Sequence, residues 1–116
     1  MVMIFARFFR APQEADLQTV GFEELRRDLD AGRVHLIDVR EPHEFGAGHV
    51  PGSSNLPLSQ FDPGALPSDR AVVLICLSGG RSARALGLAG QAGRNDVVHF
   101  QGGVTLWKSC GGPFSA

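Results

Sequence analysis

An unbroken apolar run, Ala71-Val72-Val73-Leu74-Ile75-Cys76, leads directly into a glycine-rich turn. Such a run, rich in β-branched residues, is typical of a central strand buried on both faces. Ser78-Gly79-Gly80 predicts the turn, and residues 81–91 predict a helix that ends near Gly93. A doubly buried strand that passes through a tight turn into a helix favours an α/β fold with a mainly parallel sheet.

Short strands and helical stretches alternate along the rest of the chain. Phe22, Leu25 and Leu29 have the spacing of an amphipathic helix, which should end near Gly32. A last helix should run through Trp107. Strands are expected at residues 17–20, 34–37, 54–56 and 97–100, and residues 41–57, with three prolines and three glycines, should be mostly loop. The pattern predicts a single α/β domain, its sheet flanked by helices on both faces.

Length and charge restrict the kind of protein this is. The chain has 116 residues, which suits one domain. Its 11 basic and 12 acidic residues argue against a nucleic-acid partner, because phosphate binding needs an excess of basic residues. Two cysteines are too few for a disulfide scaffold, which favours a reduced, cytoplasmic setting. No apolar run reaches the roughly 18 to 20 residues of a membrane helix, so no transmembrane segment is expected.

The N-terminal segment is treated separately from the domain. Residues 1–16 are predicted to be an extension of unknown role, and residues 17–116 to be the domain. The first ten residues are apolar but interrupted by Arg7 and Arg10, and they lack the long core and cleavage site of a secretion signal. Packing on the domain or on a second subunit is favoured over contact with a membrane surface.

Cys76 is the candidate nucleophile. It precedes a helix start, where unpaired N–H groups and the helix dipole favour negative charge. Gly79 and Gly80 allow the backbone to curl its N–H groups around one point, and Arg81 adds a positive charge. All three features favour a thiolate. The alternative is that Cys76 is a small buried residue completing a core strand.

Three motifs carry a family resemblance. Residues 76–82, Cys-Leu-Ser-Gly-Gly-Arg-Ser, resemble the C-x-x-G-x-R-S active-site loop of the rhodanese family, sulfurtransferases that pass sulfur through a cysteine persulfide. Residues 38–45 and 48–55 are similar to the family's D-x-R-x-x-x-E-[FY]-x-x-G-H-[IV]-x-G-[AS]-x-N stretch. Gly102, Gly103 and Trp107 match its closing G-G-x-x-x-W. The resemblance covers residues 17–113 and implies a single rhodanese-like domain.

The resemblance also implies a chemistry. The Cys76 thiolate would take the sulfane sulfur of a small donor such as thiosulfate and pass it to an acceptor: cyanide in an assay, a cellular thiol or a thioredoxin-like protein in life. Such ping-pong catalysis needs no metal and no organic cofactor. Cys76 is the expected catalytic residue, and the expected substrate-binding residues are Leu77, Ser78, Gly79, Gly80 and Arg81.

The polar residues near the loop have less certain roles. Arg81 would either orient an anionic donor or pair with a neighbouring carboxylate. Asp38, Arg40 and Glu44 are interpreted as a structural charge cluster. Ser82 is expected to satisfy an unpaired N–H group of the helix start, and His49 to make a structural hydrogen bond to the loop.

Competing functions remain. Leu77 and Ser78 stand where thiosulfate-using relatives often carry a basic residue, which favours a neutral or protein-bound donor. The chain could therefore be a sulfur relay or regulatory module without efficient turnover. A cysteine phosphatase is a more distant alternative, because only four residues separate Cys76 from Arg81 and none is an aspartate. The four histidines have no metal-ligand spacing with Cys76 or Cys110, and Cys110 is more consistent with a free thiol than with a resolving partner.

Overall fold

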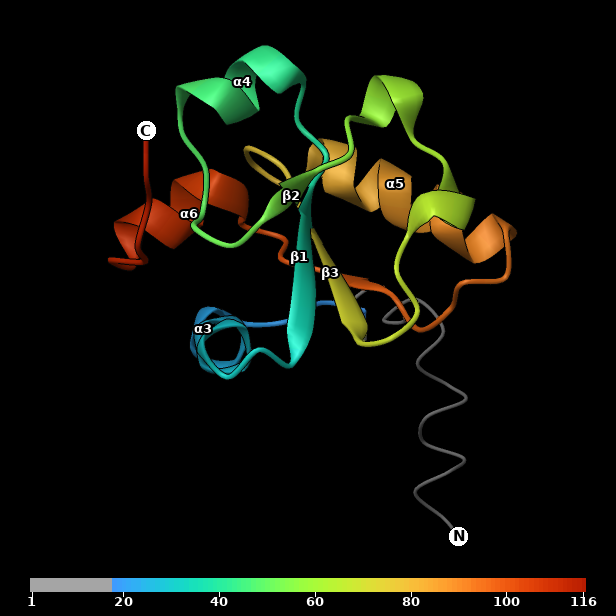
Figure 1. Ribbon diagram of the computed structural model, residues 1–116, viewed down its shortest axis with the longest axis horizontal. Coiled ribbons are helices and arrows are strands. Elements are labelled where there is room, and N and C mark those ends of the chain that lie inside the picture. Colours follow the sequence, from blue (N-terminus) through green and yellow to red (C-terminus); the bar gives the residue numbers. More distant parts are fainter. Residues whose placement is uncertain (1–17) are drawn as a thin grey trace, which may run out of the picture.

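The computed structural model describes residues 18–116 (Figure 1). Within this range one parallel sheet has the strand order β2-β1-β3-β4. Its strands are β1 (Val34–Asp38), β2 (Ser54–Asn55), β3 (Ala71–Ile75) and β4 (Val98–His99). β1 and β3 pair along their whole length, from Val34 opposite Ala71 to Asp38 opposite Ile75. Both central strands therefore end at the same edge of the sheet.

Helices cover both faces of this sheet, as predicted. Figure 1 shows α3 (Phe22–Asp30) and α6 (Gly103–Ser109) on one side of β1 and β3, and α5 (Gly80–Gln91) on the other. Side chains alternate along β3, so Val72 and Leu74 join the core under α5. Val73 and Ile75 join the core under α3 and α6, which contains Trp107. The apolar run is thus buried on both faces.

One helix was not predicted. α4 (Pro42–Ala47) lies within residues 41–57, and the prediction of a mostly irregular segment is wrong there. Pro42 occupies the first turn, where a missing N–H costs no hydrogen bond. The Glu44 carboxylate accepts a hydrogen bond from the Glu41 N–H (3.0 Å), which satisfies a donor at the helix start. Two 3-10 turns, Leu58–Gln60 and Pro63–Ala65, follow β2.

The remaining boundaries differ by a few residues. Residues 97–100 were predicted as a strand, but β4 contains only Val98 and His99. α6 continues two residues past Trp107. The strand predicted at residues 17–20 is reduced to an isolated bridge between Thr19 and His99, and Leu17 lies outside the described residues. The predicted extension, residues 1–16, also lies outside them. Within residues 18–116, no helix has both the length and the apolar character needed to cross a bilayer.

Candidate active site

Cys76 is the first residue after β3, at the edge where β1 also ends. It is buried, with only 1% of its surface exposed. The Val104 N–H donates to the Cys76 carbonyl (2.8 Å), and the Thr105 N–H donates to the Leu77 carbonyl (3.1 Å). The first turn of α6 therefore holds the start of the Cys76 loop. The loop ends in the first turn of α5.

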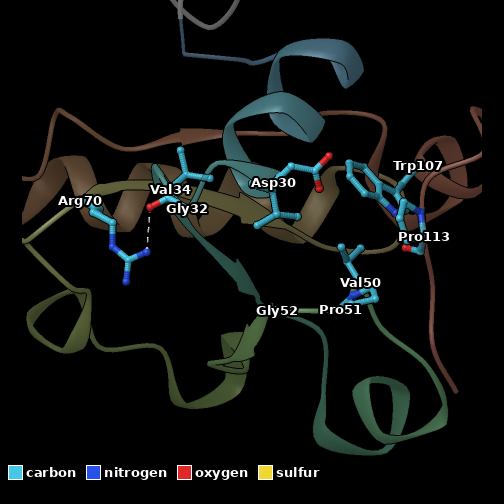
Figure 2. Close-up of a pocket in the computed structure, with 10 residues that line it drawn as sticks. Asp30, Gly32, Val34, Val50, Pro51, Gly52, Arg70, Trp107 and Pro113 are labelled. Carbon is cyan, nitrogen blue, oxygen red and sulfur yellow. Dashed lines mark hydrogen bonds between the residues drawn. The ribbon is translucent and has the colours of Figure 1, made fainter.

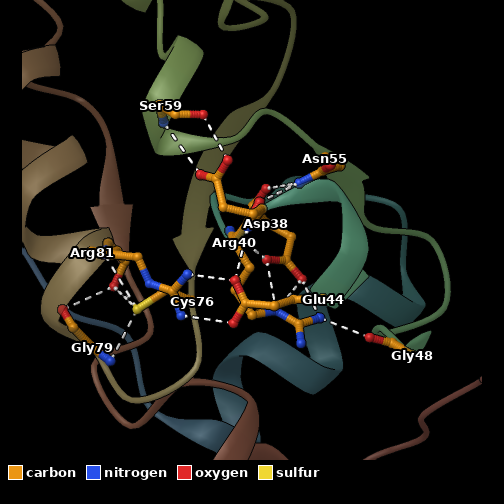
Figure 3. Close-up of polar contacts among 11 residues, drawn as sticks. Asp38, Arg40, Glu44, Gly48, Asn55, Ser59, Cys76, Gly79 and Arg81 are labelled. Carbon is orange, nitrogen blue, oxygen red and sulfur yellow. Dashed lines mark hydrogen bonds and ion pairs between the residues drawn. The ribbon is translucent and has the colours of Figure 1, made fainter. Parts of the chain in front are cut away.

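Hydrogen-bond donors of the loop converge on the sulfur of Cys76 (Figure 3). The Gly79 N–H lies 3.1 Å from Sγ, and the Ser82 N–H lies 3.3 Å from it. The Ser82 hydroxyl is 3.6 Å from Sγ, which is within hydrogen-bond range for the larger sulfur atom. Ser82 was expected to satisfy an N–H group of the helix start, whereas its side chain faces the sulfur of Cys76.

These donors change the acidity of Cys76. Burial alone would raise the pKa of the thiol, but it is outweighed by the hydrogen bonds of the Ser82 side chain and of the Ser82, Gly79 and Ser78 backbone. The pKa of Cys76 is consequently lowered from its ordinary value. The loop is arranged to favour a thiolate in a buried position.

The two glycines of the turn are not equivalent. Gly79 has a φ of +107°, and a Cβ there would lie 2.2 Å from the Gln101 carbonyl oxygen. Only glycine fits this conformation and this approach. Gly80 is the first residue of α5 and a Cβ there would meet nothing within 4 Å. Both glycines were expected to be needed for the turn of the backbone, but of the two only Gly79 has a conformation that requires glycine.

Arg81 pairs with the carboxylate of Glu44. Its Nη1 lies 2.5 Å from Glu44 Oε1 and its Nη2 lies 3.0 Å from Oε2. The Arg81 hydrogen bond is the main reason why the pKa of Glu44 is lowered to about 2. Of the two arrangements considered for Arg81, the structure has the one in which the guanidinium binds a neighbouring carboxylate. This bond joins α4 to the Cys76 loop.

Asp38 and Arg40 form a buried pair at the same edge. Arg40 Nη2 donates to Asp38 Oδ2 (2.8 Å) and to the Gly48 carbonyl (2.8 Å). Asp38 is 0% and Arg40 5% exposed, so both charges are removed from solvent. Asn55 Nδ2 donates to the carbonyls of Asp38 (2.9 Å) and Arg40 (2.8 Å). This network fixes the segment between β1 and α4, which agrees with a structural role.

The other predicted residues lie around the loop. The Leu77 side chain is 43% exposed beside the nucleophile. His49 Nδ1 bonds to the Phe45 carbonyl (2.8 Å), and its ring stacks on Phe45. The hydrogen bond expected from His49 to the Cys76 loop is therefore made to α4 instead. Cys110 is an exposed free thiol.

One residue of the site was missed. His99, at the end of β4, lies with its Nδ1 2.8 Å from the Ser82 Oγ and is 5% exposed. From the sequence, His99 was weighed only as a metal ligand, and no role at the loop was expected of it. The sequence held a signal for it: in the strand predicted at residues 97–100, Val97 and His99 are two residues apart and so share a face. Val97 packs under α5, the helix that carries Ser82.

A separate cavity lies at the opposite end of the sheet (Figure 2). It has a volume of about 230 Å³ and lies beside Val34, where β1 begins, and Arg70, which precedes β3. Arg70 Nη1 donates to the Gly32 carbonyl at its rim (3.0 Å). Within residues 18–116, no cluster of three or more His, Cys, Asp or Glu side chains is placed to hold a metal ion.

The sequence model of the Rhodanese-like domain matches residues 22–110, which include the Cys76 loop and both charge pairs. The chain belongs to the rhodanese-like domain family.

Relatives named as sulfurtransferases include proteins of about this length and longer ones. The "Probable adenylyltransferase/sulfurtransferase MoeZ" of Mycobacterium tuberculosis is 44% identical over 102 residues, which is 84% of this chain and 26% of MoeZ. The human thiosulfate:glutathione sulfurtransferase is 32% identical over 109 residues, covering 80% of this chain and 95% of the human protein. The chain thus spans about a quarter of MoeZ and nearly all of the human enzyme.

The fold of solved rhodanese structures agrees with this membership. The crystal structure of a rhodanese-related protein from Thermoplasma volcanium superposes with a TM-score of 0.75 at 28% identity. The match covers 84% of this chain and 97% of the archaeal one. The expected α/β rhodanese-like fold is confirmed.

Proposed function

We propose that this chain is a sulfurtransferase that carries sulfur as a persulfide on Cys76. The observation that carries the proposal is the convergence of the Gly79 and Ser82 N–H groups on a buried sulfur whose pKa is lowered. An ionised sulfur held by fixed donors is both a nucleophile and a good leaving group. The names of the human and mycobacterial relatives support transfer of sulfur.

The reaction has two displacement steps. The Cys76 thiolate attacks the outer sulfur of a donor such as thiosulfate, a new S–S bond forms, and sulfite leaves with the electron pair of the broken S–S bond. An acceptor nucleophile then attacks the outer sulfur of the persulfide. The S–S bond to Cys76 breaks and the thiolate is restored, so the cycle needs no net oxidant or reductant.

The loop supplies the substrate contacts. The N–H groups of Ser78, Gly79 and Ser82 that stabilise the thiolate remain in place for the persulfide. Gly80 lets α5 begin directly after the turn, and the exposed Leu77 gives an apolar rim. Arg81 is engaged by Glu44, so its contribution is to hold the loop and to add a screened positive charge.

The Arg81–Glu44 pair also bears on phosphatase activity. A phosphate-binding loop needs its arginine directed at the oxyanion, whereas here the guanidinium is shared with a carboxylate. Sulfur transfer fits this arrangement better than phosphoryl transfer.

A relay without efficient turnover is the second candidate. Cys76 is 1% exposed while its neighbour Leu77 is 43% exposed, and the mycobacterial relative is a longer protein. A protein-bound persulfide delivered against this apolar rim would suit these features, whereas a free dianion would meet no unpaired cation in the loop residues 77–80.

Intact-mass measurement after incubation with thiosulfate tests the proposal. The protein should gain the mass of one sulfur atom (about 32 Da), and cyanide should remove it. Cys76→Ala should abolish the gain, and Cys110→Ala, the matched control at the other cysteine, should keep it. No gain from thiosulfate or from a protein persulfide would refute a sulfur-carrying role. Uptake from the protein persulfide alone, without thiosulfate:cyanide turnover, would establish the relay.

A further inference from the structure

A continuous line of polar contacts runs from the nucleophile into β4. Cys76 Sγ lies 3.6 Å from Ser82 Oγ, and Ser82 Oγ lies 2.8 Å from His99 Nδ1. All three residues are buried, at 1%, 0% and 5% exposed. The second contact is short, so the imidazole is engaged with the hydroxyl and not merely close to it.

The fold holds the imidazole in place. The His99 N–H donates to the Gln18 carbonyl (2.8 Å), and the His99 carbonyl accepts from the Val20 N–H (3.1 Å). β4 is itself paired with β3, with His99 opposite Leu74. The ring lines a cavity of about 360 Å³ that is bordered by Ser78, Gly79 and Gly80 of the loop.

The effect of the Ser82–His99 contact depends on which of the two groups donates the proton. A hydroxyl has one proton to donate, and three acceptors lie near Ser82 Oγ: His99 Nδ1, the Gly79 carbonyl (3.2 Å) and Cys76 Sγ. If His99 Nδ1 is unprotonated, it competes for that proton at the shortest distance. If Nδ1 carries a hydrogen, it donates to Ser82 Oγ and leaves the hydroxyl proton for the sulfur or the Gly79 carbonyl.

We infer that His99 is a positioning residue, whose Nδ1–H donates to Ser82 and so turns the Ser82 hydroxyl proton toward the Cys76 thiolate. A hydrogen bond to a thiolate is charge-assisted and about twice as strong as one between neutral groups. The ionised sulfur therefore selects this arrangement over one in which Ser82 donates to the ring. His99 acts through Ser82 and does not touch the sulfur.

The ring performs this role as a neutral donor. Burial lowers the pKa of His99, which favours the uncharged ring over the imidazolium. Arg81 of α5 and Glu44 of α4, the charged pair beside the Cys76 loop, are bound to each other. His99 thus supplies a directed hydrogen bond rather than a positive charge.

The test is the pH dependence of alkylation at Cys76, measured by intact mass with iodoacetamide in a Cys110→Ser background. The inference rests on the proposed role of Cys76, but alkylation uses no sulfur donor, so its failure is distinguishable from failure of sulfur transfer. Ser82→Ala removes the charge-assisted hydrogen bond to the thiolate and should raise the midpoint of the pH profile by about one pH unit. His99→Leu leaves the Ser82 hydroxyl free to donate to the Gly79 carbonyl instead, so it should raise the midpoint in the same direction and by no more than Ser82→Ala does. The double variant should shift it no further.

Two amide substitutions separate positioning from packing. His99→Asn places an N–H donor near the Nδ1 position and should restore a midpoint close to the wild type. His99→Gln carries its amide one carbon further and should behave like His99→Leu. If His99→Leu fails to fold, the comparison of His99→Asn with His99→Gln still tests whether His99 acts as a hydrogen-bond donor. Equal midpoints for Asn and Gln, or wild-type midpoints for folded His99→Leu and Ser82→Ala, would overturn the inference. A midpoint raised in Asn as much as in Leu would instead assign the effect to an imidazolium charge and also overturn it.

Discussion

The two ends of the parallel sheet differ in how their polar groups are used. At the carboxyl end, N–H groups and a hydroxyl converge on one sulfur atom, and two arginine–carboxylate pairs brace the loops around it. At the amino end, a cavity of about 230 Å³ is open to the surface, but its Arg70 only binds a carbonyl at the rim and an exposed aspartate. A cavity alone is therefore a weak indication of function in this fold. Several hydrogen-bond donors directed at one sulfur atom are a stronger indication.

Removing the buried cation at the carboxyl end should have the largest effect. Arg40→Leu leaves Asp38 as an unpaired charge at 0% exposure, so the free energy of unfolding should fall by about 3 to 5 kcal/mol. Urea unfolding at neutral pH measures this change. A loss below about 1 kcal/mol would mean that Asp38 is solvated or neutral in the native protein.

The turn glycine should come next. Gly79→Ala puts a side chain at a φ of +107° and 2.2 Å from a carbonyl oxygen, so we expect a loss of about 2 to 3 kcal/mol and strongly reduced sulfur uptake from thiosulfate. Gly80→Ala is the matched control, since open space surrounds that position. It should unfold within about 1 kcal/mol of the wild type and keep uptake. Similar losses in both variants would contradict the special position of Gly79.

The pair between α4 and the loop should contribute less. Glu44→Gln removes a partly exposed ion pair, and about 1 kcal/mol or less of stability should be lost at pH 7 because solvent screens it. The pKa of Glu44 is lowered in the folded state from 4.5 to about 2, so the wild type keeps this contribution above about pH 4.5 and loses it as the pH falls toward 2. The difference in urea midpoint between the two proteins should therefore shrink between pH 5 and pH 3. A constant difference would show that the carboxylate charge is not what stabilises the contact.

A change at the amino end should have the smallest effect. Arg70→Ala removes one bond to the Gly32 carbonyl and a surface pair with Asp69, so stability should fall by less than about 1 kcal/mol. Sulfur uptake from thiosulfate should be unchanged. A tenfold loss of uptake in a folded Arg70→Ala protein would make the amino-end cavity part of the function and break the contrast between the two ends.

The sequence predicted the central strand and the position of Cys76 at its end, because a continuous apolar run followed by a glycine-rich turn is typical of a strand buried on both faces. It did not predict α4, since Pro42, Gly46 and Gly48 indicate loop and the hydrogen bonds of Glu44 depend on side-chain placement. The pairing of Arg81 with Glu44 was only one of two alternatives, because which carboxylate lies within reach depends on where α4 packs.

His99 shows a different limit. Its role depends on a contact between β4 and the first turn of α5, which are separated by most of a helix and a turn in the sequence. Local spacing carries no information about that contact, and only strand phase hinted at the face on which His99 lies. The equivalence assumed for Gly79 and Gly80 failed for a related reason, since the positive φ of Gly79 and the approach of Gln101 to it depend on the folded structure.

The hydrogen bonds from α6 to the carbonyls of Cys76 and Leu77 bear on the order in which the site is assembled. Val104 and Thr105 follow every strand of the sheet in the sequence, yet their N–H groups hold the beginning of the Cys76 loop. As a chain emerges from the ribosome, β1 and β3 can therefore pair before the loop has its full set of partners. Until α6 docks, Cys76 lies at the end of a formed sheet, but the carbonyls at the start of its loop lack their hydrogen-bond donors.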